Sequence, residues 1–213
     1  KVQEKFRDVR ASEEQLTNLK KALEKYEGTH KFHNYTSGKT SSDPSANRFI
    51  ISFITEDAIV DKNGVQWIPT LVVGQSFLLH QIRKMMSMAM DAARGAASLD
   101  IMNDSFTNQY MNVNTAPAQG LFLNMSYYDQ FNNRSCGSDS LDWHSDETSP
   151  AHLRWKKFLR NEVMSHIMDE EETLGNFVTY LFHQERHLKF DNYKATDQKI
   201  IFDRNKDRTM QEK

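Results

Sequence analysis

One short stretch brings four polar side chains to one side of an expected helix. Counted at the helical period, His80, Arg83, Lys84 and Ser87 share a face, and apolar residues fall on another. An arginine beside a lysine can donate several charge-assisted hydrogen bonds. The spacing therefore predicts a helix within residues 74–90 that packs through its apolar face and can meet a ligand through its polar face.

A second stretch, residues 28–39, is dense in aromatic and hydrogen-bonding side chains. Aromatic rings interleaved with histidine, asparagine and lysine can stack on bases while contacting phosphates, which suits single-stranded or flipped RNA. The alternative is a short helix with Phe32 and Tyr35 in the core and with His30 and His33 exposed. The sequence alone leaves both interpretations open.

The histidines do not predict a metal site. His183 and His187 are one helical turn apart, but Gln184 stands where the zinc protease motif requires glutamate. The eight glycines are scattered, so no phosphate-binding loop is present, and no serine has the G-x-S-x-G context of a nucleophile. These patterns exclude the common hydrolase and nucleotide-binding motifs, and we expect no bound metal.

Composition describes an ordinary globular chain of 213 residues, 38% hydrophobic and 26% charged. The formal net charge of -2 does not indicate a polyanion partner, although residues 28–94 carry seven basic and five acidic side chains. A nucleic-acid surface would therefore be a patch created by folding. The one cysteine, Cys136, excludes an intramolecular disulfide and agrees with a reducing compartment.

No apolar run approaches the ~18 residues that a membrane-spanning helix needs, so no membrane partner is expected. The sequence begins at Lys1 and its opening shows no targeting signal. We expect it to be a piece of a longer protein.

Capping and turn signals define the elements that position these stretches. Ser12 and Gln15 form a capping box, a stripe of leucines follows, and Gly28 is expected to stop the helix. The runs 48–54 and 65–73 are typical of strands that pair antiparallel. Four further elements are expected, namely helices within 96–110 (capped by Ser98), 153–163 (after Ser149 and Pro150) and 174–188, and a third strand at 121–128. A surface connection at 132–150, anchored by Trp143, and a polar segment beyond Asp191 complete the chain.

Four blocks of the sequence carry a family resemblance: GTHKFHNYTSGK, DPSANRFI, GQSFLLHQIRKM and APAQGLFL. In this order and spacing they resemble the C-terminal half of eukaryotic tRNA pseudouridine synthases of the TruA family. The resemblance implies an α+β pseudouridine synthase half-domain, with an antiparallel sheet, flanking helices and an extra C-terminal helical segment. We expect a catalytic subdomain at residues 1–131, followed by a connection and helical extension at 132–213.

The family resemblance also implies an activity and a site. In the family an aspartate attacks or deprotonates a flipped uridine, the glycosidic bond breaks, and the base rejoins through C5 without a cofactor. The H-x-x-R match makes Arg83 the expected partner of that aspartate, and Leu121 matches an apolar residue of the uridine pocket, with plain core packing as its alternative. RNA contacts are expected from five residues: Lys31, His33, Lys39, His80 and Lys84.

The sequence departs from the family pattern at two points. The Arg-Thr-Asp-x-Gly-Val motif that holds the catalytic aspartate is absent from these 213 residues, so we expect this chain alone to be inactive. Ser87 stands where many members have glycine, which bears on how closely the helix packs. The expected partners are tRNA, other RNAs and the N-terminal half of the same enzyme, in the nucleus or alternatively in mitochondria. A non-catalytic RNA-binding or scaffold domain is the alternative function.

Overall fold

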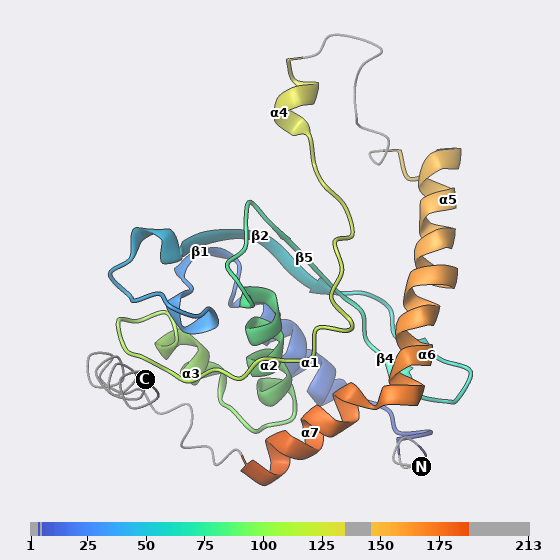
Figure 1. Cartoon of the computed structure of the whole chain (residues 1–213), viewed down its shortest axis with the longest axis horizontal. Helices are drawn as coiled ribbons and strands as arrows, with labels where there is room; N and C mark the ends of the chain where they lie inside the picture. Colours follow the sequence, from blue (N-terminus) through green and yellow to red (C-terminus); the bar gives the residue numbers. More distant parts are fainter. Residues whose placement is uncertain (1–3, 5, 135–145, 188–213) are drawn as a thin grey trace, which may run out of the picture. The chain divides into compact units, whose positions relative to one another are not determined.

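The computed structural model describes residues 4, 6–134 and 146–187 (Figure 1). The chain forms two compact units, one of residues 1–117 with 177–213 and one of residues 118–176. The domain boundary expected between residues 131 and 132 falls inside the second unit and stays a prediction. Cys136, Trp143 and the segment beyond Asp191 lie outside the described residues.

Helix α1 (Glu13–Glu24) begins with the predicted capping box. The Ser12 hydroxyl accepts a hydrogen bond from the Gln15 backbone N–H at 3.1 Å, and the Gln15 side chain accepts one from the Ser12 N–H at 2.9 Å. Gly28 lies after the helix with φ +92°, a conformation that glycine adopts without strain. Gly28 is also the first residue of strand β1 (Gly28–Lys31). The residue expected to stop the helix is therefore where the sheet begins.

The main sheet is antiparallel, with strand order β1-β2-β5. Strands β2 (Asn47–Thr55) and β5 (Thr70–Gly74) confirm the predicted pairing. The run expected as one strand at 65–73 is instead divided, because β4 (Gln66–Trp67) pairs with β3 (Ile59–Val60) in a separate sheet. Pro69 follows β4 and lacks a backbone donor, which interrupts the ladder there.

Helices α1 and α2 (Gln81–Ala93) cover one face of this sheet (Figure 1). The core between them is built around the fully buried Tyr26, whose ring lies 5.4 Å from the Tyr35 ring, edge to face. Its hydroxyl donates to the Met85 carbonyl at 3.0 Å and so ties α1 to α2. The other rings around it are Phe32, Phe53 and Phe106.

The remaining helices follow the capping signals closely. Helix α3 (Leu99–Asp104) begins after Ser98 as predicted, but it is shorter than the expected 96–110 because turns replace it after Ser105. Two 3₁₀ turns, η2 (His33–Tyr35) and η3 (Pro44–Ala46), lie between β1 and β2. Helix α7 (Asn176–His187) confirms the helix predicted at 174–188, and from Phe177 it belongs to the first unit.

In the second unit, α4 (Asp129–Asn132) is followed by a run of helix, comprising α5 (Pro150–Phe158), a π-helical turn (Leu159–Met164) and α6 (Ser165–Leu174). The Ser149 hydroxyl caps α5 as predicted, with Pro150 in its first turn. None of the described helices is long and apolar enough to cross a bilayer.

The third strand predicted at 121–128 is wrong. The segment has no regular secondary structure and pairs with no strand among the described residues, and most of its apolar side chains are exposed, Leu123 by 81%. A strand needs a partner for its backbone groups as well as an alternating pattern. The pattern alone therefore gave a false positive.

We predict that Phe32→Ala lowers the free energy of unfolding by about 3–5 kcal/mol, because it empties a fully buried ring site in the aromatic core. Chemical denaturation of the protein measures this change. Phe131→Ala is the matched control, since that ring is 47% exposed and its loss should change stability by ~0.5 kcal/mol or less. A small effect at Phe32 would contradict its assignment to the core.

Candidate functional site

The predicted polar face of α2 begins at an unusual backbone conformation. His80, the residue before the helix, has φ 63° and ψ 4°, a left-handed conformation that side-chain-bearing residues rarely adopt. The buried Gln81 side chain accepts a hydrogen bond from the Leu78 N–H at 2.8 Å, which stabilises this turn. His80 remains exposed at the start of the helix.

Arg83 is half-buried and joined to residue 116 in both directions. Its Nε donates to the Ala116 carbonyl at 2.6 Å, and the Ala116 N–H donates to the Arg83 carbonyl at 3.3 Å. One terminal nitrogen, Nη1, lies 3.3 Å from His80 Nδ1. In the described part of the chain no carboxylate lies within 4.0 Å of this guanidinium. Arg83 is thus oriented by a carbonyl and retains donors for an anion.

The Lys84 side chain makes its polar contacts inside the fold. Its Nζ lies 3.5 Å from the carbonyl oxygens of Asn34 and Thr36, and burial lowers the pKa of its ammonium group. The Thr36 hydroxyl in turn donates to the Leu79 carbonyl at 2.9 Å. These bonds hold the turn after β1 against the start of α2. The RNA contact expected of Lys84 stays a prediction.

Of the two interpretations of residues 28–39, an RNA surface or a core segment, the structure mainly supports the core segment. Phe32 and Tyr35 are fully buried, as the core alternative required, but His33 is only 2% exposed, whereas that alternative left it exposed. His33 Nε2 lies 3.1 Å from the Gln109 carbonyl, and burial is the main cause that lowers the pKa of its ring. The RNA contact expected of His33 has no support from this placement, because its ring presents almost no surface.

Asn34 connects the same turn to the segment after α3. Its side-chain nitrogen donates to the Ser105 and Gln109 carbonyls at 2.8 and 3.0 Å, and its oxygen accepts from the Met111 N–H at 2.9 Å. Ser105, Gln109 and Met111 belong to the segment between α3 and Ala116. Sequence reasoning passed over Asn34, although a buried asparagine that saturates backbone groups is a recurrent way to fix a turn.

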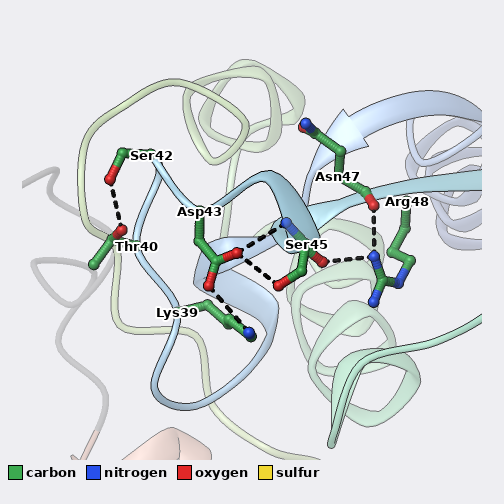
Figure 2. Close-up of polar contacts among 7 residues, drawn as sticks. All are labelled: Lys39, Thr40, Ser42, Asp43, Ser45, Asn47 and Arg48. Carbon is green, nitrogen blue, oxygen red and sulfur yellow. Dashed lines mark hydrogen bonds and ion pairs between the residues drawn. The ribbon is translucent and has the colours of Figure 1, made fainter.

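The loop after this turn is held by its own polar groups (Figure 2). Lys39 pairs with Asp43 at 3.0 Å, and the Asp43 carboxylate accepts from the Ser45 N–H and hydroxyl at 2.8 and 2.6 Å. The hydrogen bond from the Ser45 hydroxyl, then that from Lys39 and that from the Ser45 N–H, lower the pKa of Asp43 to about 2. Arg48 donates to the Ser45 and Asn47 carbonyls at 2.6 and 2.7 Å. The loop therefore has a defined shape.

The two lysines predicted to contact RNA differ in their surroundings. The charge of Lys39 is balanced by the Asp43 carboxylate, whereas Lys31 donates to the neutral Asn108 side chain at 2.9 Å. Lys31 therefore contributes more positive potential to this surface than Lys39 does.

Leu121 belongs to the second unit and is 44% exposed, which argues against the core alternative for this residue, and its role in a substrate pocket stays a prediction. No group of three or more histidine, cysteine or acidic residues in the described ranges is arranged to hold a metal ion. Ala116 was missed as a site residue because it acts through its backbone. The APAQGLFL block that contains it was the available signal.

Comparison with known proteins identifies a family match over residues 22–129, described as tRNA pseudouridine synthase. The chain is 42% identical over 133 residues to tRNA pseudouridine synthase 1 of Candida albicans, covering 62% of this chain and 22% of that protein. It is 33% identical over 178 residues to tRNA pseudouridine synthase 1 of Kluyveromyces lactis, covering 82% and 32%. The human Pseudouridylate synthase 1 homolog is 37% identical over 152 residues, covering 67% and 35%. The matched regions span between about a fifth and about a third of these relatives.

We predict a pH dependence of stability from Lys84. Because burial lowers its pKa in the folded protein below 10.5, the unfolded chain holds a proton that the folded chain has lost between those two pKa values. The free energy of unfolding should therefore rise with pH across that window, and Lys84→Met should remove this component. Urea denaturation from pH 7 to about 10 tests it. Lys20→Met, at an exposed position of α1, is the control that should leave the slope unchanged.

Proposed function

We propose, because this chain belongs to the tRNA pseudouridine synthase family, that it forms part of an enzyme that isomerises uridine to pseudouridine in tRNA. The observation that carries the proposal is the state of Arg83. Its guanidinium is oriented by the Ala116 carbonyl, and no carboxylate pairs with it among the described residues. An arginine held in this way is ready to receive an anionic partner.

The partner in this proposal is a catalytic aspartate that lies outside these 213 residues, in the N-terminal half of the same enzyme. A guanidinium beside a carboxylate stabilises its ionised form and lowers its pKa. Arg83 would thus keep the aspartate charged and directed at the sugar of the target uridine. The bond between the sugar C1′ and N1 of the base breaks, and the base turns and forms a new bond from C5 to C1′. C5 then loses its proton, and N1 carries a proton in the product. No atoms are gained or lost, and the reaction needs no cofactor.

The target uridine must leave its stack to reach such a site. In the proposal the exposed Leu121 side chain contacts the flipped base, and the exposed His80 lies beside the phosphates near Arg83. Lys31 and Lys39 contribute to the RNA surface along β1 and the following loop. Other RNAs are proposed as additional substrates, and the proposed location is the nucleus, with mitochondria as the alternative.

We predict that Arg83→Ala in the whole enzyme lowers turnover by about 10²-fold or more, because the aspartate loses a charge-assisted partner. Arg83→Lys should restore little activity, since an ammonium group lacks the fork that binds Ala116 and a carboxylate together. Pseudouridine formation in a tRNA substrate measures the effect, and circular dichroism checks that the variants fold.

Arg154→Ala is the matched control, because the Arg154 Nε also donates to a carbonyl, that of Pro150, but its side chain is exposed on α5. It should retain near-normal turnover. Full activity of Arg83→Ala would overturn the assigned role. Absence of any uridine conversion by the whole protein, with tRNA binding intact, would favour the non-catalytic RNA-binding function. Activity of the 213-residue chain alone would show that the aspartate is not missing.

We also predict that Lys31→Ala weakens tRNA binding and reduces the slope of log affinity against log salt by about 1, as loss of one phosphate contact does. Lys39→Ala should have a smaller effect, because Asp43 already balances that charge. Binding measured at several salt concentrations tests both variants. An unchanged slope for Lys31→Ala would remove this side chain from the RNA surface.

A further inference from the structure

Helix α7 contacts both of the segments that hold Arg83. The Tyr180 hydroxyl lies 2.5 Å from the Ser87 hydroxyl, which is one turn beyond Arg83 on α2. One turn further along α7, the Gln184 side-chain oxygen accepts from the Asn114 side-chain nitrogen at 3.3 Å. Asn114 lies two residues before Ala116, whose carbonyl receives the Arg83 Nε. The same helix therefore bonds to both sides of the Arg83–Ala116 pair.

Tyr180 and Gln184 act as one polar row, because residues four apart lie on the same side of a helix. Two side-chain hydrogen bonds, one between Tyr180 and Ser87 and one between Gln184 and Asn114, thus leave the same side of α7. Through α7, these two bonds connect α2 to the segment that carries the Ala116 carbonyl.

This row is shielded from water. Ser87 is fully buried and Gln184 is 4% exposed, so water is poorly placed to replace their bonds. Burial is the main cause that raises the pKa of Tyr180 to about 12, and the phenol therefore keeps its proton at neutral pH. The bond to Tyr180 provides the partner that the buried Ser87 hydroxyl needs.

The attachment of α7 does not depend on these polar groups alone. Near its start, the Phe177 ring meets the Trp67 ring edge to face at 6.0 Å. Leu181 and Phe182 lie beside α1 and α2 around an apolar cavity of about 450 Å³. Removing the Tyr180 hydroxyl should therefore leave α7 docked. Its bond to Ser87 is thus not needed to attach the helix.

We propose that Tyr180 and Gln184 are positioning residues for Arg83. By bonding to Ser87 and Asn114 they fix α2 relative to residues 114–116, and so keep the Arg83 Nε on the Ala116 carbonyl with its remaining donors directed at the anionic partner. The consequence for turnover rests on the proposed function of Arg83. The consequence for the Arg83–Ala116 bond does not.

The first test is kinetic. In the whole enzyme, Tyr180→Phe should lower kcat by about 3- to 10-fold with KM unchanged, the effect of one lost buried hydrogen bond. Ser87→Ala should have the same effect, and the double variant should be no worse than either single variant, because both changes remove one bond. Thr179→Ala, an exposed neighbour on α7, is the control expected to match the unmodified enzyme. A change in KM alone, or additive losses, would overturn the proposal.

The second test does not require activity. Nuclear magnetic resonance of the Arg83 Nε–H should show about fivefold faster hydrogen exchange in Tyr180→Phe, because the loss of the row eases opening of the bond to Ala116. Exchange of the Trp67 indole N–H, which donates to Asp61 at 3.0 Å beside Phe177, should stay unchanged and report that α7 is docked.

Unchanged Arg83 exchange would overturn the positioning role even if turnover fell. Faster Arg83 and Trp67 exchange together would also overturn it, since α7 would then have detached as a whole. Faster Arg83 exchange alone, in an enzyme whose Arg83→Ala variant is fully active, would support the positioning role while rejecting the proposed function of Arg83.

Discussion

The Tyr26 side chain is the contact on which the rest of the first unit depends. Its ring lies against four other aromatic rings, from the turn after β1, from β2 and from the segment after α3, and its hydroxyl bonds the Met85 carbonyl on α2. One residue, two positions after the end of α1, therefore joins the sheet to the helix that carries Arg83. Met85 is two residues from Arg83, so the aromatic core also determines where the guanidinium lies.

The polar face of α2 is divided between structural and available groups. Lys84 lies over the carbonyls of the preceding turn, and Ser87 bonds to Tyr180, so both are occupied inside the fold. His80 is exposed, and one terminal nitrogen of Arg83 lies beside its ring. Desolvation makes buried polar groups costly unless they are bonded. Backbone carbonyls and hydroxyl groups provide the partners for Lys84 and Ser87. Arg83, which bonds to the Ala116 carbonyl, has no acidic partner among the described residues.

Charged side chains on the surface near the site also have partners within the chain. The loop between η2 and β2 satisfies its own polar groups, with Asp43 balancing Lys39 and capping η3. With a net charge of -2 over the whole chain, attraction of RNA would depend on individual uncompensated side chains such as Lys31. Counting basic residues in the sequence treats Lys31 and Lys39 alike, but their neighbours make them different.

The sequence by itself determined the features governed by local chemistry. The Ser12 and Ser149 caps and the helix at Arg83 follow from side chains within a few residues of one another. The pairing of β2 with β5 follows from two strand patterns that are close in sequence. Order and spacing of four sequence blocks were also enough to indicate the family. Only the tertiary structure decided that residues 121–128 form no strand, that His33 is buried, that Arg83 is held by the Ala116 backbone, and that Ser87 bonds to α7. These outcomes depend on partners 30 to 100 residues away in sequence, and a local pattern carries no information about whether such a partner is present.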